Sequence, residues 1–173
     1  MFDFLKNIFG PGETTQPEAP ATPQYNTAPG TEIRYHPELI SELTADHKAL
    51  LALYGEIKEA FDQADYPTVA EKLNTFRSDL QAHLLTENVR LYIYLNRSLG
   101  DDETNSELIQ GFRREMNEIA KVAMKFLRKY EAIGVDKDLA KAFAKDFAII
   151  GKVLVERIEK EEQVLYPLYM PSY

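Results

Sequence analysis

Five ionisable residues stand at positions where the helical pattern of the chain calls for apolar side chains: His47, His83, Glu87, Arg157 and Glu161. Apolar residues recur around them in steps of three or four, which is the period of a helix with one buried face. Charged groups are rarely buried without a partner or a metal ion. Two imidazoles and one or two carboxylates suit Fe(II), Mn(II) or Zn(II). The pattern therefore predicts either a metal site or a buried ion network.

The composition restricts this chemistry further. The chain contains no Cys, which excludes disulfides, thiolate nucleophiles and cysteine-based zinc or iron–sulfur sites. It has three histidines, and His36 directly precedes Pro37 at an expected helix start, so we interpret His36 as a boundary residue. Any metal site must therefore combine His47 and His83 with carboxylates.

Charge and hydropathy argue against other classes of protein. The net charge is -8 and the pI is near 5.0, with Lys and Arg scattered among Glu and Asp, so we expect no nucleic-acid partner. No run of about 18 apolar residues occurs, so no membrane span is predicted. Residues 1–10 do not read as a signal peptide, because Asp3, Lys6 and Asn7 interrupt the apolar stretch. We therefore expect a cytoplasmic protein.

The apolar stripes predict four helices, over about residues 37–63, 67–97, 104–133 and 136–165. Pro37 suits a first helical turn, Gly134 stands where a left-handed cap is expected, and Pro167 ends the last helix. Loops this short imply antiparallel neighbours. The sequence therefore predicts an all-α, up-down-up-down antiparallel four-helix bundle over residues 36–168, followed by a short C-terminal tail over residues 169–173.

Two segments of the predicted bundle are similar in sequence. Residues 80–92 can be laid over residues 154–166 at a constant offset of 74 residues, so the two halves of the bundle read as an internal repeat. In that register Arg157 takes the place of His83, and on the matching stripe Met116 takes the place of His47. His47 and His83 lie at nearly the same height on neighbouring helices, because each is about 15 residues from the shared loop.

Three motifs carry a family resemblance: Asp46-His47-Lys48-Ala49-Leu50, His83 followed by Glu87, and Glu161-Glu162-Gln163-Val164-Leu165-Tyr166-Pro167. They resemble the motifs of the hemerythrin-like (HHE cation-binding) domain family, whose members hold two irons in a bundle core. The resemblance implies that His47 and His83 bind one iron and that Glu87 and Glu161 are the bridging carboxylates. Met116 and Arg157 stand where the family has histidines for the second iron, so the resemblance implies an incomplete metal site.

Two functional interpretations remain open at this stage. In the first, one iron or another divalent metal binds His47, His83, Glu87 and Glu161, and the protein is a small sensor or regulatory protein for oxygen, nitric oxide or iron. In the second, no cofactor is bound: Arg157 replaces the metal charge, and the bundle is a protein-interaction or regulatory module. Arginine stays protonated and cannot bind iron. No general acid, base or substrate pocket can be named, so we expect no enzyme.

The N-terminal region has a different character. Residues 11–35 carry five prolines among small and polar residues, which predicts a disordered, flexible linker. Residues 1–10 form an apolar tip, with Phe2, Leu5, Ile8 and Phe9 available to dock on a protein partner. Contact with a membrane surface is a less favoured alternative, because the tip carries a single Lys. A third alternative is that the tip folds back onto its own bundle.

Overall fold

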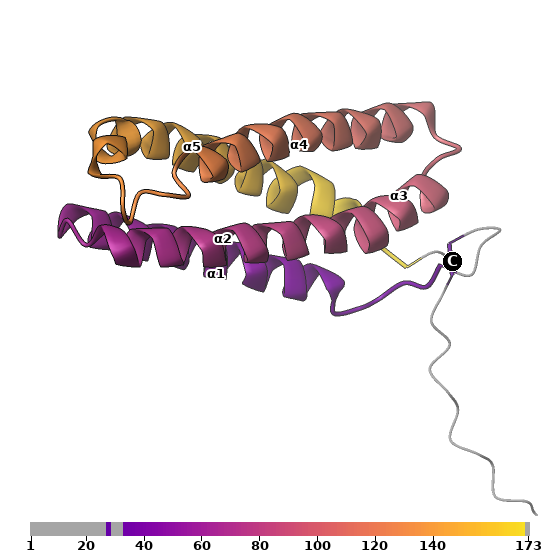
Figure 1. Cartoon of the computed structure of the whole chain (residues 1–173). Coiled ribbons are helices and arrows are strands. Elements are labelled where there is room, and N and C mark those ends of the chain that lie inside the picture. The colour runs from indigo at the N-terminus through magenta and orange to yellow at the C-terminus, as the bar shows by residue number, and fades with distance from the viewer. Residues whose placement is uncertain (1–26, 29–32, 172–173) are drawn as a thin grey trace, which may run out of the picture.

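Long antiparallel helices make up most of the computed structural model, which describes residues 27–28 and 33–171 (Figure 1). The helix α1 spans Leu39–Asp62, and α2 spans Tyr66–Thr86 and continues through the π-helical turn η1 (Glu87–Leu91) into α3 (Tyr92–Ser98). The helix α4 spans Glu103–Lys129. The last arm consists of the 3-10 turn η2 (Lys137–Leu139), α5 (Ala140–Lys160), the π-helical turn η3 (Glu161–Leu165) and the 3-10 turn η4 (Tyr166–Leu168).

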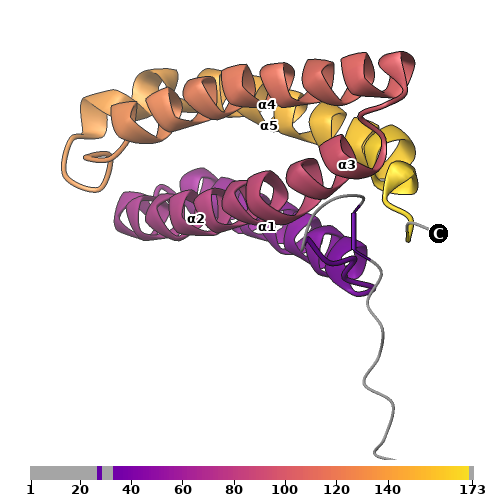
Figure 2. The same cartoon turned by 90° about the vertical axis from the view of Figure 1, so that its right-hand side faces the viewer.

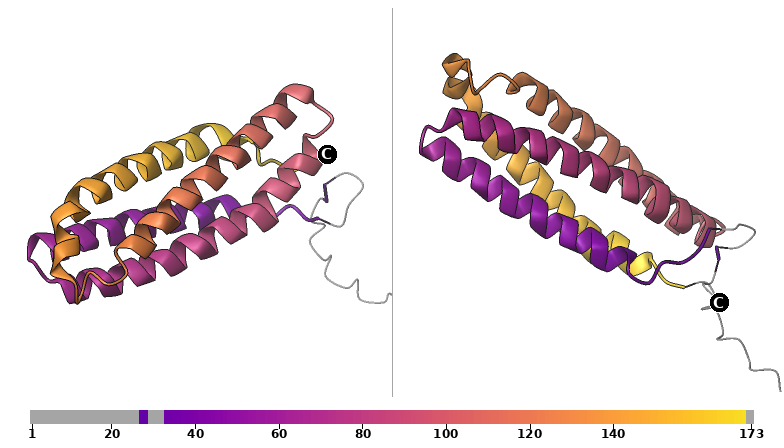
Figure 3. Two further views of the ribbon diagram at one scale, coloured as in Figure 1. Left: turned by 45° about the horizontal axis from the view of Figure 1, so that its top comes forward. Right: turned by 60° about the horizontal axis from the view of Figure 1, so that its bottom comes forward.

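The four arms form two layers, with α1 and α2 in one layer and α4 and α5 in the other (Figure 2). Successive arms run in opposite directions and are joined at the ends of the bundle (Figure 3). The predicted all-α, up-down-up-down antiparallel bundle is therefore confirmed. Among the described residues, no helix is both long and apolar enough to cross a membrane.

Short polar side chains define where the helices begin. The Asp65 carboxylate accepts a hydrogen bond from the Thr68 backbone N–H at the start of α2, and Asp102 caps α4 in the same way. The left-handed cap predicted at Gly134 was wrong: α4 already ends at Lys129, and the positive φ of 57° in the first loop belongs to Ala64. A Cβ at Gly134 would lie 3.3 Å from the Ala70 Cβ, so this glycine instead permits close packing against α2.

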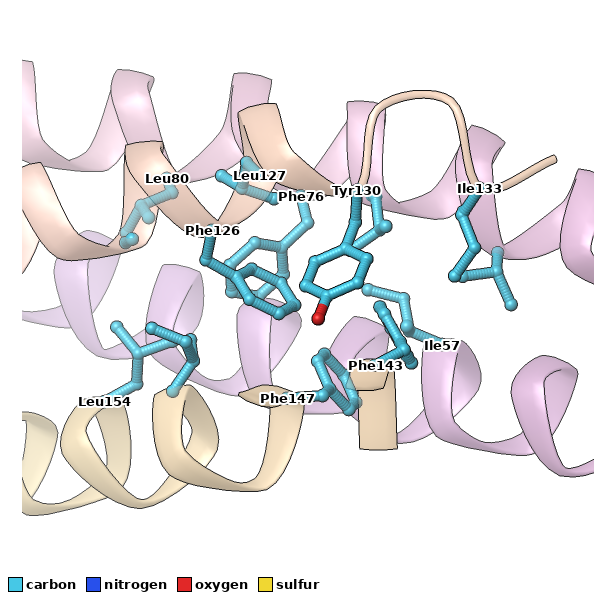
Figure 4. Close-up of a cluster of buried hydrophobic side chains, with 14 of the residues drawn as sticks. Ile57, Phe76, Leu80, Phe126, Leu127, Tyr130, Ile133, Phe143, Phe147 and Leu154 are labelled. Atoms are coloured by element: carbon cyan, nitrogen blue, oxygen red, sulfur yellow. The ribbon is translucent and has the colours of Figure 1, made fainter. Parts of the chain in front are cut away.

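Two apolar clusters fill the interior and leave a gap between them for the ionisable residues. The larger cluster lies toward the α1–α2 loop and is rich in phenylalanine, with Phe143, Phe147 and Phe126 meeting Ile57 and Tyr130 (Figure 4). The smaller cluster occupies the other end of the bundle and includes Leu39, Leu43, Leu91, Leu95, Ile109 and Leu165. Along α1, α2 and α5 the polar positions fall between residues of the two clusters.

The packed region extends beyond the predicted bundle limits. Ala28 is buried and its N–H donates to the Ile33 carbonyl, and Tyr35 stacks on Tyr169 with ring centroids 4.9 Å apart. Residues assigned by sequence to the linker and to the C-terminal tail therefore cover the end of the bundle near α3. The predicted docking residues Phe2, Leu5, Ile8 and Phe9, and most of the predicted linker, lie outside the described residues.

Candidate metal centre

All five ionisable residues singled out in the sequence meet inside the bundle. His47 comes from α1, His83 from the last turns of α2, Glu87 from η1, Arg157 from α5 and Glu161 from η3. Each is at most 4% exposed. Burial of charged groups to this degree requires compensating partners or a metal ion. The centre therefore divides into a histidine half and an arginine half, which share the two glutamates.

The histidine half has its ligand atoms close together. His47 Nε2 lies 3.2 Å from His83 Nε2 and 3.3 Å from Glu161 Oε2. The ligand atoms of these three residues all lie within 4.8 Å of one another, so one ion could contact all three. Glu87 stands slightly farther away, with its Oε2 3.8 Å from His83 Nε2.

Outer carboxylates fix which nitrogen of each imidazole faces the centre. His47 Nδ1 is 2.9 Å from Glu162 Oε1, and His83 Nδ1 is 3.4 Å from Asp46 Oδ2. An ionised carboxylate only accepts hydrogen bonds, so each Nδ1 carries the proton and each Nε2 presents a lone pair. Two lone pairs that face each other at 3.2 Å repel unless a cation or an additional proton lies between them.

One carboxylate oxygen of the buried Glu87 has no hydrogen-bond partner. Glu87 Oε1 accepts a hydrogen bond from the Tyr166 hydroxyl at 3.1 Å, while its Oε2 is the one buried side-chain nitrogen or oxygen atom without a hydrogen-bond partner among the described residues. Burial, and then the neighbouring charge of Glu161, raise the pKa of Glu87 to about 8. A buried oxygen with no partner, adjacent to three candidate ligand atoms, is suited to a fourth metal contact.

The titration of the two histidines differs. Burial disfavours the charged form of His47, but its hydrogen bonds with Glu161 and Glu162 outweigh that effect and raise its pKa. Burial and the neighbouring charge of His47 lower the pKa of His83. Without a metal, the additional proton would therefore reside on His47 rather than on His83.

The arginine half is closed by the protein itself. Arg157 points into the core, where its Nε donates to Glu161 Oε1 at 2.6 Å and its Nη2 donates to the Tyr92 hydroxyl at 2.8 Å. Its Nη1 reaches Glu115, and its guanidinium lies over the Phe112 ring, 4.7 Å from the centroid. A fixed positive charge thus occupies the half of the centre in which the sequence lacks two histidines.

Comparison with known families decides the assignment. The family model of the hemerythrin HHE cation-binding domain matches residues 38–169. The chain belongs to this family. Comparison with curated proteins and with solved structures gave no match. As a hemerythrin domain, the bundle is expected to bind a cation, and the donors present fit one ion in the histidine half but not a second ion beside Arg157.

The internal repeat is visible in the backbone of the hemerythrin domain. The two π-helical turns begin at the matched glutamates, Glu87 and Glu161, and π-helical turns often occur at functional sites. The residues that follow them also match, because Tyr166 donates to Glu87 while Tyr92 accepts from the arginine. An outer carboxylate also matches in the two halves: Asp46, next to His47, contacts His83, and Glu115, next to Met116, contacts Arg157. The two halves therefore have a glutamate, a tyrosine and an outer carboxylate at matching positions.

A small apolar cavity adjoins the centre. It has a volume of about 30 Å³, room for roughly two water-sized molecules, and its apolar lining includes Leu50, Phe76, Leu80, Met116 and Leu154. It extends toward the surface between α1 and α5, where Leu51 and Val155 are about 40% exposed. Tyr54 lies beside it, stacked on Phe147, and a Cβ at Gly151 would collide with that tyrosine ring.

Sequence reasoning missed the supporting residues Asp46, Glu162 and Tyr166 as parts of the centre. Asp46 and Glu162 are half-exposed neighbours of the stripe residues, so they resemble an ordinary solvated face. Glu115 is a further half-exposed carboxylate of this kind, and it bonds Arg157 and Lys160. The stripe advances by two successive steps of four residues at each π-helical turn, but it does the same at Leu39, Leu43 and His47 in α1, so the spacing does not identify the turns.

Proposed function

We propose that this hemerythrin domain binds a single divalent metal ion, with iron as the expected metal, and acts as a small sensor or regulatory protein for oxygen, nitric oxide or iron. The observation that carries the proposal is the pair of imidazole Nε2 atoms 3.2 Å apart, both with a Glu161 oxygen within 4.8 Å and both rings held by carboxylates behind them. Such an arrangement supplies lone pairs to a cation rather than hydrogen bonds to a neighbour.

Four residues would hold the ion: His47, His83, Glu161 and Glu87. A bound iron would supply an open coordination position for a small ligand such as oxygen or nitric oxide. Arg157 orients Glu161, because its Nε donates to the oxygen that does not face His47. The same guanidinium repels a second cation, so the protein holds one ion where the family motif provides for two.

The adjoining cavity supports a small uncharged ligand. Its lining away from the centre is aliphatic and aromatic, and its volume is close to that of a few atoms. An apolar cavity of this size favours a diatomic molecule over a polar substrate. We therefore propose reversible binding of a ligand and not catalysis.

The proposal is tested with the whole chain, loaded with Fe(II) without oxygen and then titrated with nitric oxide while the absorption spectrum is recorded. We expect one nitric oxide per chain, with the spectral change lost in His83→Ala. A matched control is His36→Ala, since His36 is exposed at the N-terminal side of α1 and makes no contact with the centre. A folded, iron-containing protein that binds neither nitric oxide nor oxygen would contradict a role in sensing these two gases.

A second candidate function is favoured by the arginine half. Arg157 is fully buried and bonded to Glu161 and Tyr92, as expected for a core ion network that needs no metal. In that case the bundle would be a protein-interaction or regulatory module, with a proton on His47 taking the place of the ion. His83→Ala would then lower the free energy of unfolding without changing any metal content.

A further inference from the structure

The outer face of the α2 arm carries a row of exposed apolar side chains. Leu85, Val89 and Ile93 are 63%, 53% and 38% exposed and follow one another in steps of four residues. At about 1.5 Å of rise per residue, they extend over about 12 Å along the helical arm. Isolated exposed apolar residues are ordinary, whereas a continuous row of them indicates a contact surface.

A groove runs beside this row, between α1 and the α2 arm. Its walls are Glu42 and Asp46 from α1 and Leu85, Thr86, Val89 and Arg90 from the opposite arm. Of the two wall carboxylates, Glu42 pairs with Arg90 at 3.2 Å, whereas Asp46 contacts the ring of His83. The groove thus places two apolar side chains, Leu85 and Val89, beside a residue that orients a proposed metal ligand.

The N-terminal tip has the dimensions and charge to occupy this groove. Phe2, Leu5 and Phe9 recur in steps of three and four, so as a helix they would form one face about 10 Å long, close to the length of the exposed row. The same segment carries one side-chain charge of each sign: Lys6 is opposite in charge to Asp46, and Asp3 is opposite in charge to Arg90. The match in length and charge favours this segment over an unrelated apolar partner.

The connection between tip and bundle also has suitable reach. The chain meets the bundle at Thr27, which forms a bridge with Arg34, and the Tyr35 ring packs 5.8 Å from that of Tyr94, the residue after Ile93. Residues 11–26 could extend over about 50 Å if stretched. A tether of this length gives the tip an effective concentration on the order of millimolar at a surface on its own chain.

We propose that residues 1–10 dock in the α1–α2 groove of the same molecule, with Phe2, Leu5 and Phe9 against Leu85, Val89 and Ile93. Docking covers Asp46 and removes competing water from its hydrogen bond with His83. A partner that captures the tip would expose Asp46 again, so docking links an external partner to the orientation of His83. The docking itself does not depend on a bound metal, whereas the link to metal affinity rests on the proposed function.

Paramagnetic relaxation in the full chain tests the docking. Because the chain has no Cys, Asn7→Cys accepts a single nitroxide label on the tip. We expect selective broadening of the amide signals of Thr86, Val89 and Arg90, and none at Val122 and Ile149 on the outer face of α4 and α5. Uniform weak broadening, or broadening centred on α4 and α5, would overturn the proposal.

Matched variants and a mixing experiment complete the test. Val89→Asp should abolish the selective broadening, while Val122→Asp should not, since the two valines are exposed to nearly the same extent, 53% and 51%. In a second experiment, nitroxide-labelled chains without isotopes are mixed with isotope-labelled chains without nitroxide, and we expect no broadening. Broadening in this mixture would overturn docking within one chain and assign the groove to a second copy. Iron affinity should fall severalfold in Val89→Asp and stay unchanged in Val122→Asp. A protein that shows the broadening but binds no metal would contradict the proposed function and leave the docking intact.

Discussion

Replacing both Met116 and Arg157 by histidine is expected to convert the centre from one metal ion to two. The arginine half already has the groups that a second ion needs: the shared carboxylates of Glu87 and Glu161 and a supporting carboxylate at Glu115. Met116 is buried and lines the cavity beside the centre, so an imidazole at that position faces the same space. In the internal repeat, Met116 corresponds to His47 and Arg157 corresponds to His83.

The guanidinium charge sets the size of the expected effect. Only the Glu161 carboxylate separates it from the histidine half, and a second divalent ion would lie nearer still. At about 5 Å and an effective dielectric constant of about 20, a divalent ion and a guanidinium repel each other by about 7 kcal/mol. This energy corresponds to a factor of about 10⁵ in affinity. Met116→His alone should therefore leave one ion per chain, and only the double variant should take two.

Elemental analysis of Fe(II)-loaded protein, after removal of excess metal, gives the stoichiometry directly. The expected values are one ion for the natural chain, one for Met116→His and two for the double variant. Far-UV circular dichroism should show that all three proteins are folded. The reasoning would be refuted if Met116→His alone bound two ions, or if the folded double variant still bound one.

The remaining predictions concern stability and the outer contacts. In metal-free protein, the free energy of unfolding should fall by at most about 5 kcal/mol as pH rises from about 4.5 to about 8. Because the pKa of Glu87 is raised in the folded state, the folded protein holds a proton in this range that the unfolded chain has released. Urea titrations across this range should show the slope, and Glu87→Gln should flatten it; a slope unchanged in that variant would contradict the assignment. Glu162→Ala and Asp46→Ala should each weaken metal binding about 10- to 100-fold, measured by competition with a chelator, with the larger loss for Glu162, whose contact is the shorter one. Gly151→Ala should destabilise the fold by about 1–3 kcal/mol in thermal unfolding, because the added Cβ displaces the stacked Tyr54 ring. Gly111→Ala, whose Cβ would meet no atom within 4 Å, should stabilise the fold by about 0.5–1 kcal/mol. Equal effects of the two variants would contradict the packing around Gly151.

The positions of the buried polar residues could be predicted from sequence because a helix with one buried face has a strict period. His47, His83 and Glu161 each fall on a stripe that is otherwise apolar, so any bundle that buries the stripes must bring them inside. Short loops then place neighbouring arms antiparallel and set the height of each residue. The direction of Arg157 could not be obtained in this way, because its long stem allows the charge to reach solvent from the same position. Its ring and carboxylate contacts hold it inside.

The supporting groups were beyond prediction for a different reason. Asp46 and Glu162 belong to positions that are half exposed, and their contacts depend on how far each arm is rotated about its axis. The π-helical turns alter that rotation, because each inserts an additional residue into the helical repeat at Glu87 and Glu161. Gly134 lies beyond the end of α4 and permits a close approach to Ala70, which the sequence alone does not distinguish from a left-handed cap.

Metal content of the natural chain tests the central claim most directly. The protein should be purified without oxygen or chelator and analysed for elements beside the double variant His47→Ala/His83→Ala. We predict about one iron or manganese per chain in the natural protein and none in the variant. No metal in either folded protein would contradict the single-ion centre and would identify Arg157 as the cation of a metal-free core.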